Sequence, residues 1–134
     1  MKRTDAFVDA NVLLYLPDAR IQRALVAEEL MRRGGVISVQ VLDEFASVAS
    51  RKMGMPWPAI RDLLDAIRLN LSIVGTGVKT HELGLDLSER YRFSVYDSML
   101  LAAALQAGCT TFFSEDLHDG QVIENTLSIR NPFR

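Results

Sequence analysis

The chain has 134 residues, which suits one hydrophobic core, and we expect residues 1–134 to form a single domain. Its 49% hydrophobic and 24% charged residues are typical of a globular protein and argue against disorder. A formal net charge of −2, from 15 basic and 17 acidic residues, gives no overall attraction to a polyanion.

The sequence predicts neither export nor insertion into a membrane. The basic start, Met1–Arg3, imitates a signal peptide, but Asp5 and Asp9 interrupt the apolar stretch that such a peptide needs. The longest apolar run, 99–105, is far shorter than the ~20 residues that span a bilayer. The single cysteine, Cys109, forms no internal disulfide and fits a reducing compartment. We therefore expect a cytoplasmic protein with no membrane contact.

Hydrophobic periodicity and turn residues predict strands that alternate with helices along the chain. The expected strands are 4–8, 36–38, 71–74, 110–113 and a last edge strand at 127–130. The expected helices are 12–16, 21–33, one with an apolar stripe over 41–49, 59–69, 79–91 and 95–107. This alternation favours parallel pairing with right-handed crossovers, which places helices on both faces of the sheet.

Four acidic residues stand where predicted strands end or predicted helices begin. Asp9 and Asp116 closely follow apolar strands, whereas Glu44 and Asp97 lie early in helices. Because parallel strands all end at the same edge of a sheet, we expect the four side chains to meet in one pocket. Four carboxylates would repel one another without a cation, and hard cations such as Mg²⁺ prefer carboxylate oxygens. The sequence therefore predicts a site for divalent metal ions.

Two of these residues could instead cap helices. Asp9 precedes a predicted helix, and Asn11 could be that cap or could bond Asp9 or a metal-bound water. Ser94 and Asp97 have the spacing of a capping box, in which the acidic side chain reaches back to the cap N–H. Asp97 could therefore be a cap, a ligand, or each in a different state.

The other acidic residues and the histidines also have ordinary explanations. Glu44 and its neighbour Asp43 both border the apolar stripe, so the helical wheel does not choose between them. Asp116 lies in an acidic cluster typical of surface loops, although a buried strand leads into it. His81 and His118 have polar neighbours typical of surface residues, so we do not expect them to bind metal.

Several other site classes lack a required feature. There is no Gly-rich phosphate loop and no nucleophile elbow of the G-x-S-x-G type. A phosphohydrolase of the haloacid dehalogenase type needs a second Asp two residues after the first, and that position is Asn11. A receiver domain needs a Lys after a late strand, which Ser114-Glu115-Asp116 does not supply.

Four segments together resemble the successive motifs of the PIN domain family. They are Phe7-Val8-Asp9-Ala10-Asn11-Val12, Glu44, Tyr96-Asp97-Ser98-Met99-Leu100 and Phe112-Phe113-Ser114-Glu115-Asp116. Their order, their spacings and the total length match, so the resemblance covers essentially the whole chain. Within the family, the chain looks most like a VapC-type toxin ribonuclease of a bacterial type II toxin–antitoxin system.

The resemblance implies a Mg²⁺- or Mn²⁺-dependent endoribonuclease with a three-layer α/β/α fold around a central, mainly parallel five-stranded sheet. It carries over four catalytic, metal-binding acidic residues: Asp9, Glu44, Asp97 and Asp116. It thereby favours Glu44 over Asp43. Asn11 and Ser114 match accessory polar positions, Ser114 standing where many relatives have threonine. One or two ions, an RNA substrate, a cognate antitoxin and a homodimer are the implied cofactors and partners.

The resemblance leaves two alternatives: a PIN-like protein-binding module without nuclease activity, and a small PIN nuclease outside toxin–antitoxin systems. The net charge does not exclude RNA, because without the four acidic residues 13 acidic side chains face 15 basic ones, 12 of them arginine. Met53, Met55 and Trp57 belong either to the core or to an apolar surface that a partner helix contacts.

Overall fold

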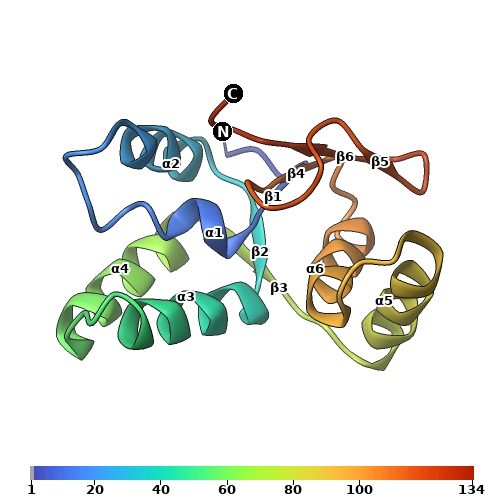
Figure 1. The fold of residues 1–134 in the computed structure, drawn as a ribbon, viewed down its shortest axis with the longest axis horizontal. Coiled ribbons are helices and arrows are strands. Elements are labelled where there is room, and N and C mark those ends of the chain that lie inside the picture. The colour runs from blue at the N-terminus through green and yellow to red at the C-terminus, as the bar shows by residue number, and fades with distance from the viewer. Residues whose placement is uncertain (1) are drawn as a thin grey trace.

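The computed structural model describes residues 2–134 (Figure 1). Within these residues six strands form one sheet in the order β3-β2-β1-β4-β6-β5. The strands are β1 (Ala6–Val8), β2 (Val36–Ser38), β3 (Ser72–Val74), β4 (Thr111–Phe113), β5 (Val122–Ile123) and β6 (Leu127–Arg130). The helices are α1 (Ala10–Leu13), α2 (Gln22–Arg33), α3 (Val39–Arg51), α4 (Trp57–Asn70), α5 (Val78–Tyr91) and α6 (Val95–Gln106).

The order of the strands determines where the helices lie. The chain builds the sheet outward from β1 through β2 to β3, and then returns to place β4 on the other side of β1. Right-handed crossovers in opposite directions put α1–α4 on one face and α5 and α6 on the other, as Figure 1 shows to the left and lower right of the strands. The three-layer α/β/α architecture with a mainly parallel sheet is confirmed.

Two details of the predicted sheet were wrong. Over residues 2–134 the sheet has six strands, not five, and β6 lies between β4 and β5 rather than at the edge. The additional strand, β5, pairs antiparallel with β6 across a tight turn in which Glu124 and Asn125 have φ of 52° and 55°. Two residues are too few to show the alternation from which a strand is predicted.

The strands that lead to the predicted acidic residues are anchored by two aromatic rings. Phe7 in β1 and Phe112 in β4 are fully buried and stack with ring centroids 5.3 Å apart. The two residues are also register partners in the parallel ladder. Residues 100–104 of α6 are buried, which explains why its sequence is almost wholly apolar. Among the described residues, none of the helices has the length and apolar character of a membrane span.

Replacing Phe112 by Ala should therefore strongly destabilise the fold. A fully buried Phe→Ala change removes ring contacts and leaves a cavity, which typically costs about 3–5 kcal/mol of unfolding free energy. Urea unfolding measures this, with Phe93→Ala as the control, since Phe93 is only partly buried. A loss below about 1 kcal/mol at Phe112 would contradict the central role of the stacked pair.

Candidate metal centre

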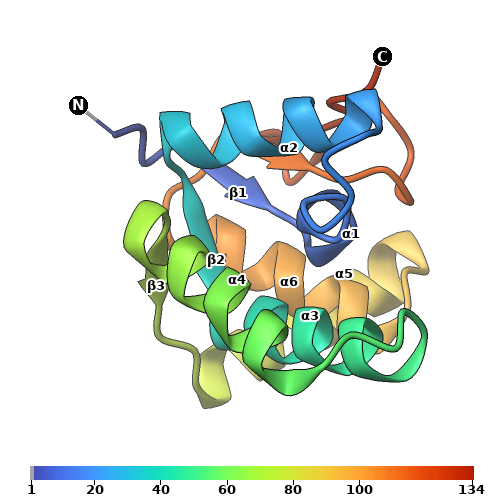
Figure 2. The same ribbon diagram turned by 90° about the vertical axis from the view of Figure 1, so that its left-hand side faces the viewer.

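The carboxyl ends of β1 and β4 lie together where the direction of strand order reverses. In parallel sheets such a reversal opens a crevice in which ligands bind. β1 runs into α1 with only Asp9 between them (Figure 2). The Asp9 N–H donates to the carbonyl of Phe113, the last residue of β4, at 2.9 Å. The topology thus delivers Asp9 and the segment that follows β4 to one place.

A pocket of about 360 Å³ opens at this edge. The sequence-predicted residues that line it are Asp9, Asn11, Glu44, Asp97 and Asp116. The remaining lining residues are Ala10, Leu14, Ser47, Val48 and Lys52. Asp43 is exposed and is not among the lining residues, whereas Glu44 is half-buried and lines the pocket. Both histidines are exposed, and neither lines this pocket.

Asp9 is the buried carboxylate of the pocket, with only 5% of its surface exposed. Within residues 2–134 its side chain caps no helix, although it directly precedes α1. Instead it accepts hydrogen bonds from Ser114 Oγ at 3.1 Å and Asn11 Nδ2 at 3.3 Å. Burial raises the pKa of Asp9 to about 7; the Ser114 bond opposes this rise, and the charges of Glu44 and Asp97 add to it.

Asp97 is likewise not used as a helix cap. Ser94 Oγ accepts the Asp97 N–H at 3.1 Å and so caps α6. The reciprocal bond from the Ser94 N–H to the Asp97 carboxylate is not formed between these two described residues, and Asp97 lines the pocket. The carboxylate therefore remains available to a ligand.

Glu44 is oriented by a residue that sequence reasoning missed. Gln40 Nε2 donates to Glu44 Oε1 at 3.1 Å and to the carbonyl of Tyr96 at 3.0 Å, which ties α3 to the start of α6. Burial raises the pKa of Glu44, the Gln40 bond lowers it, and Asp97 raises it again. The i, i+4 spacing of Gln40 and Glu44 on one helix is the signal that could have identified this pair.

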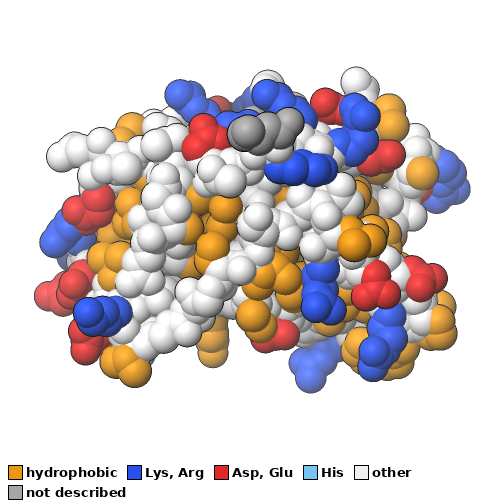
Figure 3. All heavy atoms as spheres, turned by 180° about the vertical axis from the view of Figure 1, so that it is seen from behind, with side chains coloured by type: hydrophobic (Ala, Val, Ile, Leu, Met, Phe, Trp, Pro, Cys, Tyr) orange, Lys and Arg blue, Asp and Glu red, His pale blue; other side chains and the backbone are white. Residues whose placement is uncertain are grey.

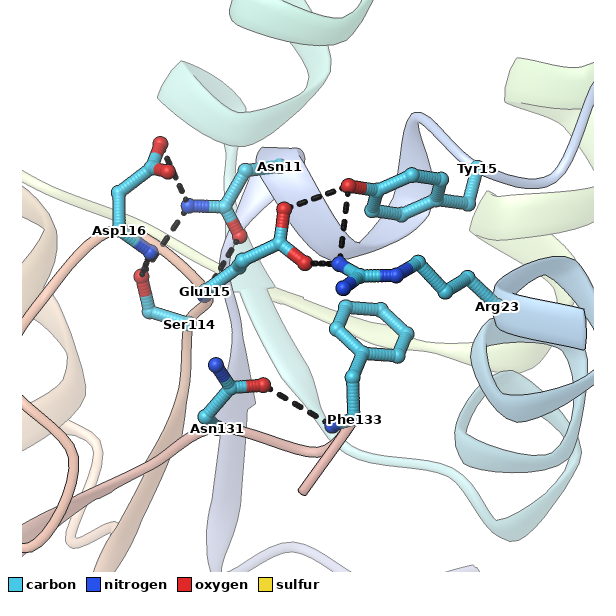
Figure 4. Close-up of polar contacts among 8 residues, drawn as sticks. All are labelled: Asn11, Tyr15, Arg23, Ser114, Glu115, Asp116, Asn131 and Phe133. Atoms are coloured by element: carbon cyan, nitrogen blue, oxygen red, sulfur yellow. Dashed lines mark hydrogen bonds and ion pairs between the residues drawn. The ribbon is translucent and has the colours of Figure 1, made fainter.

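Asn11 and Ser114 connect Asp9 with Asp116, and Figure 4 shows their contacts with Asp116. Asn11 Nδ2 lies 3.1 Å from both Ser114 Oγ and Asp116 Oδ2, and Asn11 Oδ1 accepts the Glu115 N–H at 3.2 Å. Ser114 is buried and also accepts the Asp116 N–H at 3.3 Å, whereas Asp116 is exposed at the pocket mouth. The two accessory residues thus hold a buried and an exposed carboxylate beside each other.

The donor set fits a hard divalent cation, but the carboxylates do not converge on one point. Within residues 2–134 no three His, Cys, Asp or Glu side chains stand close enough to hold one ion directly. None of the four pocket carboxylates forms an ion pair with a basic side chain of the described chain. Mg²⁺ takes one or two protein carboxylates and keeps several waters, so this spacing suits ions that are coordinated partly through water.

The PIN domain family model matches residues 6–118. A comparison with curated proteins gave no significant match. Among solved structures, the VapC20 toxin of Mycobacterium tuberculosis, described as cleaving the sarcin–ricin loop, has a TM-score of 0.67 and 21% identity over 83% of this chain and 89% of that one. A toxin–antitoxin complex from Klebsiella pneumoniae has a TM-score of 0.68 and 19% identity, over 95% of this chain and 97% of that one.

A third similar structure is VapBC2 from Rickettsia felis, bound to a DNA fragment from its promoter. Its TM-score is 0.69 and its identity 17%, over 96% of this chain and 100% of that one. At identities this low, the TM-scores show a shared fold and nothing finer: the chain has the fold of VapC toxins.

The buried position of Asp9 predicts that Asp9→Asn stabilises the metal-free protein at alkaline pH. Below the unfolded-state pKa of 3.8, Asp9 is protonated in both the folded and the unfolded state, so its titration does not change the stability of the fold. As pH rises towards the folded-state pKa of about 7, only the unfolded state ionises, so the stability of the wild type falls. Asn has no such titration.

Thermal unfolding in EDTA should show a higher midpoint for Asp9→Asn than for the wild type at pH 8, and a smaller difference at pH 5. Each 1 kcal/mol corresponds to about 4 °C in a chain of this size. Asp43→Asn, at an exposed position, is the control and should change little at either pH. A wild type that is as stable as Asp9→Asn at pH 8 would show that ionisation of Asp9 does not destabilise the folded protein.

Proposed function

The chain belongs to the PIN domain family, and we propose that it is a Mg²⁺- or Mn²⁺-dependent endoribonuclease that hydrolyses RNA phosphodiester bonds. The observation that carries this proposal is a single pocket lined by four carboxylates from distant parts of the chain, one of them the buried Asp9. These side chains have no basic partner in residues 2–134, so divalent cations are the counter-charge they require.

The side chains of the pocket have distinct proposed roles. One or two divalent ions, when bound, would activate water for attack on phosphorus and neutralise charge on the leaving 3′ oxygen. Asp9, Asp97 and Asp116 would hold the ions as ligands. Glu44, oriented by Gln40, is a further ligand or positions the attacking water. Asn11 and Ser114 keep the carboxylates of Asp9 and Asp116 in fixed orientations.

Lys52 is our candidate for the first contact with substrate phosphate. It ends α3 as the C-cap and is the basic side chain that lines the acidic pocket within residues 2–134. It is exposed and forms no ion pair with another described residue. A phosphate that enters the pocket can therefore be held by Lys52. We expect single-stranded RNA, whose base edges are open to sequence-specific contacts.

We further propose that the chain is the cytoplasmic toxin of a toxin–antitoxin pair, a single PIN domain over 1–134 that forms a homodimer. Two of the similar structures are toxin–antitoxin complexes, which supports an antitoxin partner.

Trp57 and Met53 are 58% and 41% exposed and so are not core residues. Two overlapping hollows of about 500 Å³ lie beside α4 and β3, one of them also lined by Val39 and Leu42 of α3, and expose apolar side chains among charged ones. Figure 3 shows the protein from behind the view of Figure 1, and apolar side chains lie between charged ones on this face too.

Asp97→Asn and Glu44→Gln should each reduce cleavage of single-stranded RNA in Mg²⁺ by roughly a hundredfold or more, the scale of losing one preorganised electrostatic group. Asp43→Asn is the matched control, since Asp43 is adjacent to Glu44 but exposed outside the pocket. EDTA should abolish wild-type cleavage. Undiminished cleavage by Asp97→Asn, or in EDTA, would contradict the assignment of this pocket as a metal-dependent nuclease site. A wild type without any cleavage would favour a protein-binding module.

Lys52→Ala should weaken RNA binding and lower its dependence on salt. Loss of one phosphate contact to a single strand reduces the slope of log K against log salt by about 0.7. Binding is measured on the Asp97→Asn background, so that the RNA stays intact. Arg51→Ala, one residue away and outside the pocket lining, should change the slope less. An equal or larger effect at Arg51 would remove Lys52 from the substrate path.

A further inference from the structure

Beside the metal pocket lies a second cluster, formed by Tyr15, Arg23, Glu115 and Phe133 (Figure 4). Tyr15 donates its hydroxyl hydrogen bond to Glu115 Oε1, and Arg23 forms an ion pair with Glu115 Oε2. The Glu115 side chain is only 24% exposed. These four residues are absent from the pocket lining, yet Glu115 is the direct neighbour of Asp116.

Arg23 is held on several sides. Its guanidinium carbon lies 5.4 Å from the ring centroid of Tyr15 and 4.9 Å from that of Phe133, and Nη1 donates to the Tyr15 hydroxyl at 3.2 Å. The two rings pack edge to face with centroids 5.1 Å apart. The Phe133 N–H donates to Asn131 Oδ1 at 2.9 Å, which secures the segment that carries the second ring. Arg23 therefore contacts two rings, a hydroxyl and a carboxylate, although its side chain is 48% exposed.

The cluster joins two of the segments that line the pocket, the region of α1 and the segment that follows β4. Tyr15 follows α1, which begins directly after Asp9, and Arg23 lies in α2. Glu115 belongs to the segment that follows β4, and its N–H already donates to Asn11. The ion pair thus adds a further link, between α2 and the loop that carries Asp116. It also neutralises Glu115, which would otherwise be a fifth negative charge next to the pocket.

We infer that Arg23 and Glu115 are positioning residues, and that their ion pair holds the Ser114–Asp116 loop so that Asp116 can bind a metal ion together with Asp9. The inference rests on the proposed role of the pocket in metal binding, but it concerns affinity for the metal rather than contact with RNA. A group that orients a ligand typically affects metal affinity or activity about 10–100-fold. The effect should appear in metal affinity and kcat, while KM for RNA stays unchanged.

The test is calorimetric titration of the full chain with Mn²⁺ alone, followed by kinetics on RNA. Arg23→Ala and Glu115→Gln should each weaken Mn²⁺ binding about tenfold, and Arg23→Lys, which keeps the charge but loses the fork and the stacking, should recover part of it. The matched control is Arg32→Ala, which breaks the exposed Arg32–Glu29 ion pair on the same helix and should leave Mn²⁺ affinity unchanged. Circular dichroism verifies that each variant folds. If Arg23→Ala does not fold, the Mn²⁺ affinity of Glu115→Gln tests the positioning role.

The outcomes separate the two proposals. Weakened Mn²⁺ binding in the Arg23 and Glu115 variants supports the positioning role even if the wild type cleaves no RNA, in which case the nuclease proposal alone fails. Mn²⁺ affinities equal to those of the wild type and of Arg32→Ala would overturn the positioning role, as would a folded wild type that binds no Mn²⁺. A rise in KM with unchanged kcat and Mn²⁺ affinity would also overturn it, because it would place the pair on the RNA path.

Discussion

A buried carboxylate without a basic partner in residues 2–134 is the constraint on which the rest of the site depends. Asp9 accepts hydrogen bonds from the neutral groups of Ser114 and Asn11, and the charges of Glu44 and Asp97 disfavour its ionised form further. In a metal-free protein this arrangement is destabilising at neutral pH. A bound divalent cation would make the same arrangement stabilising, because each charge that raises the pKa of Asp9 also attracts the ion.

The topology of the sheet makes this arrangement possible. Residues as far apart as Asp9 and Asp116 meet because β1 and β4 are neighbours at the point where strand order reverses. The stacked rings of Phe7 and Phe112 fix these two strands inside the core. The site therefore combines the ends of two buried strands with the short segment 114–116, in which Ser114 is buried and Asp116 is exposed. The Arg23–Glu115 ion pair contacts this segment next to Asp116.

Much of this could be predicted from the sequence, because the signals are local and periodic. Helix stripes, caps and short apolar runs place most elements to within a few residues, and parallel topology then brings strand-end carboxylates together. The choice of Glu44 over Asp43 could not be made from the helical wheel, since both border the apolar stripe; only the resemblance and then the packing favour Glu44. β5 is too short to give a pattern. The contacts of Arg23 with Glu115 join segments 92 positions apart, and no local pattern encodes such a pairing.

The most direct test of the account is a crystal structure of the protein with Mn²⁺, in which anomalous scattering locates the ions. The account predicts anomalous density in the pocket beside Asp9, within coordination range of its carboxylate or of waters that it holds, and bordered by Glu44, Asp97 and Asp116. Mn²⁺ found only at unrelated surface carboxylates, with the pocket free of density at saturating Mn²⁺, would contradict the claim that these side chains are gathered to bind a cation.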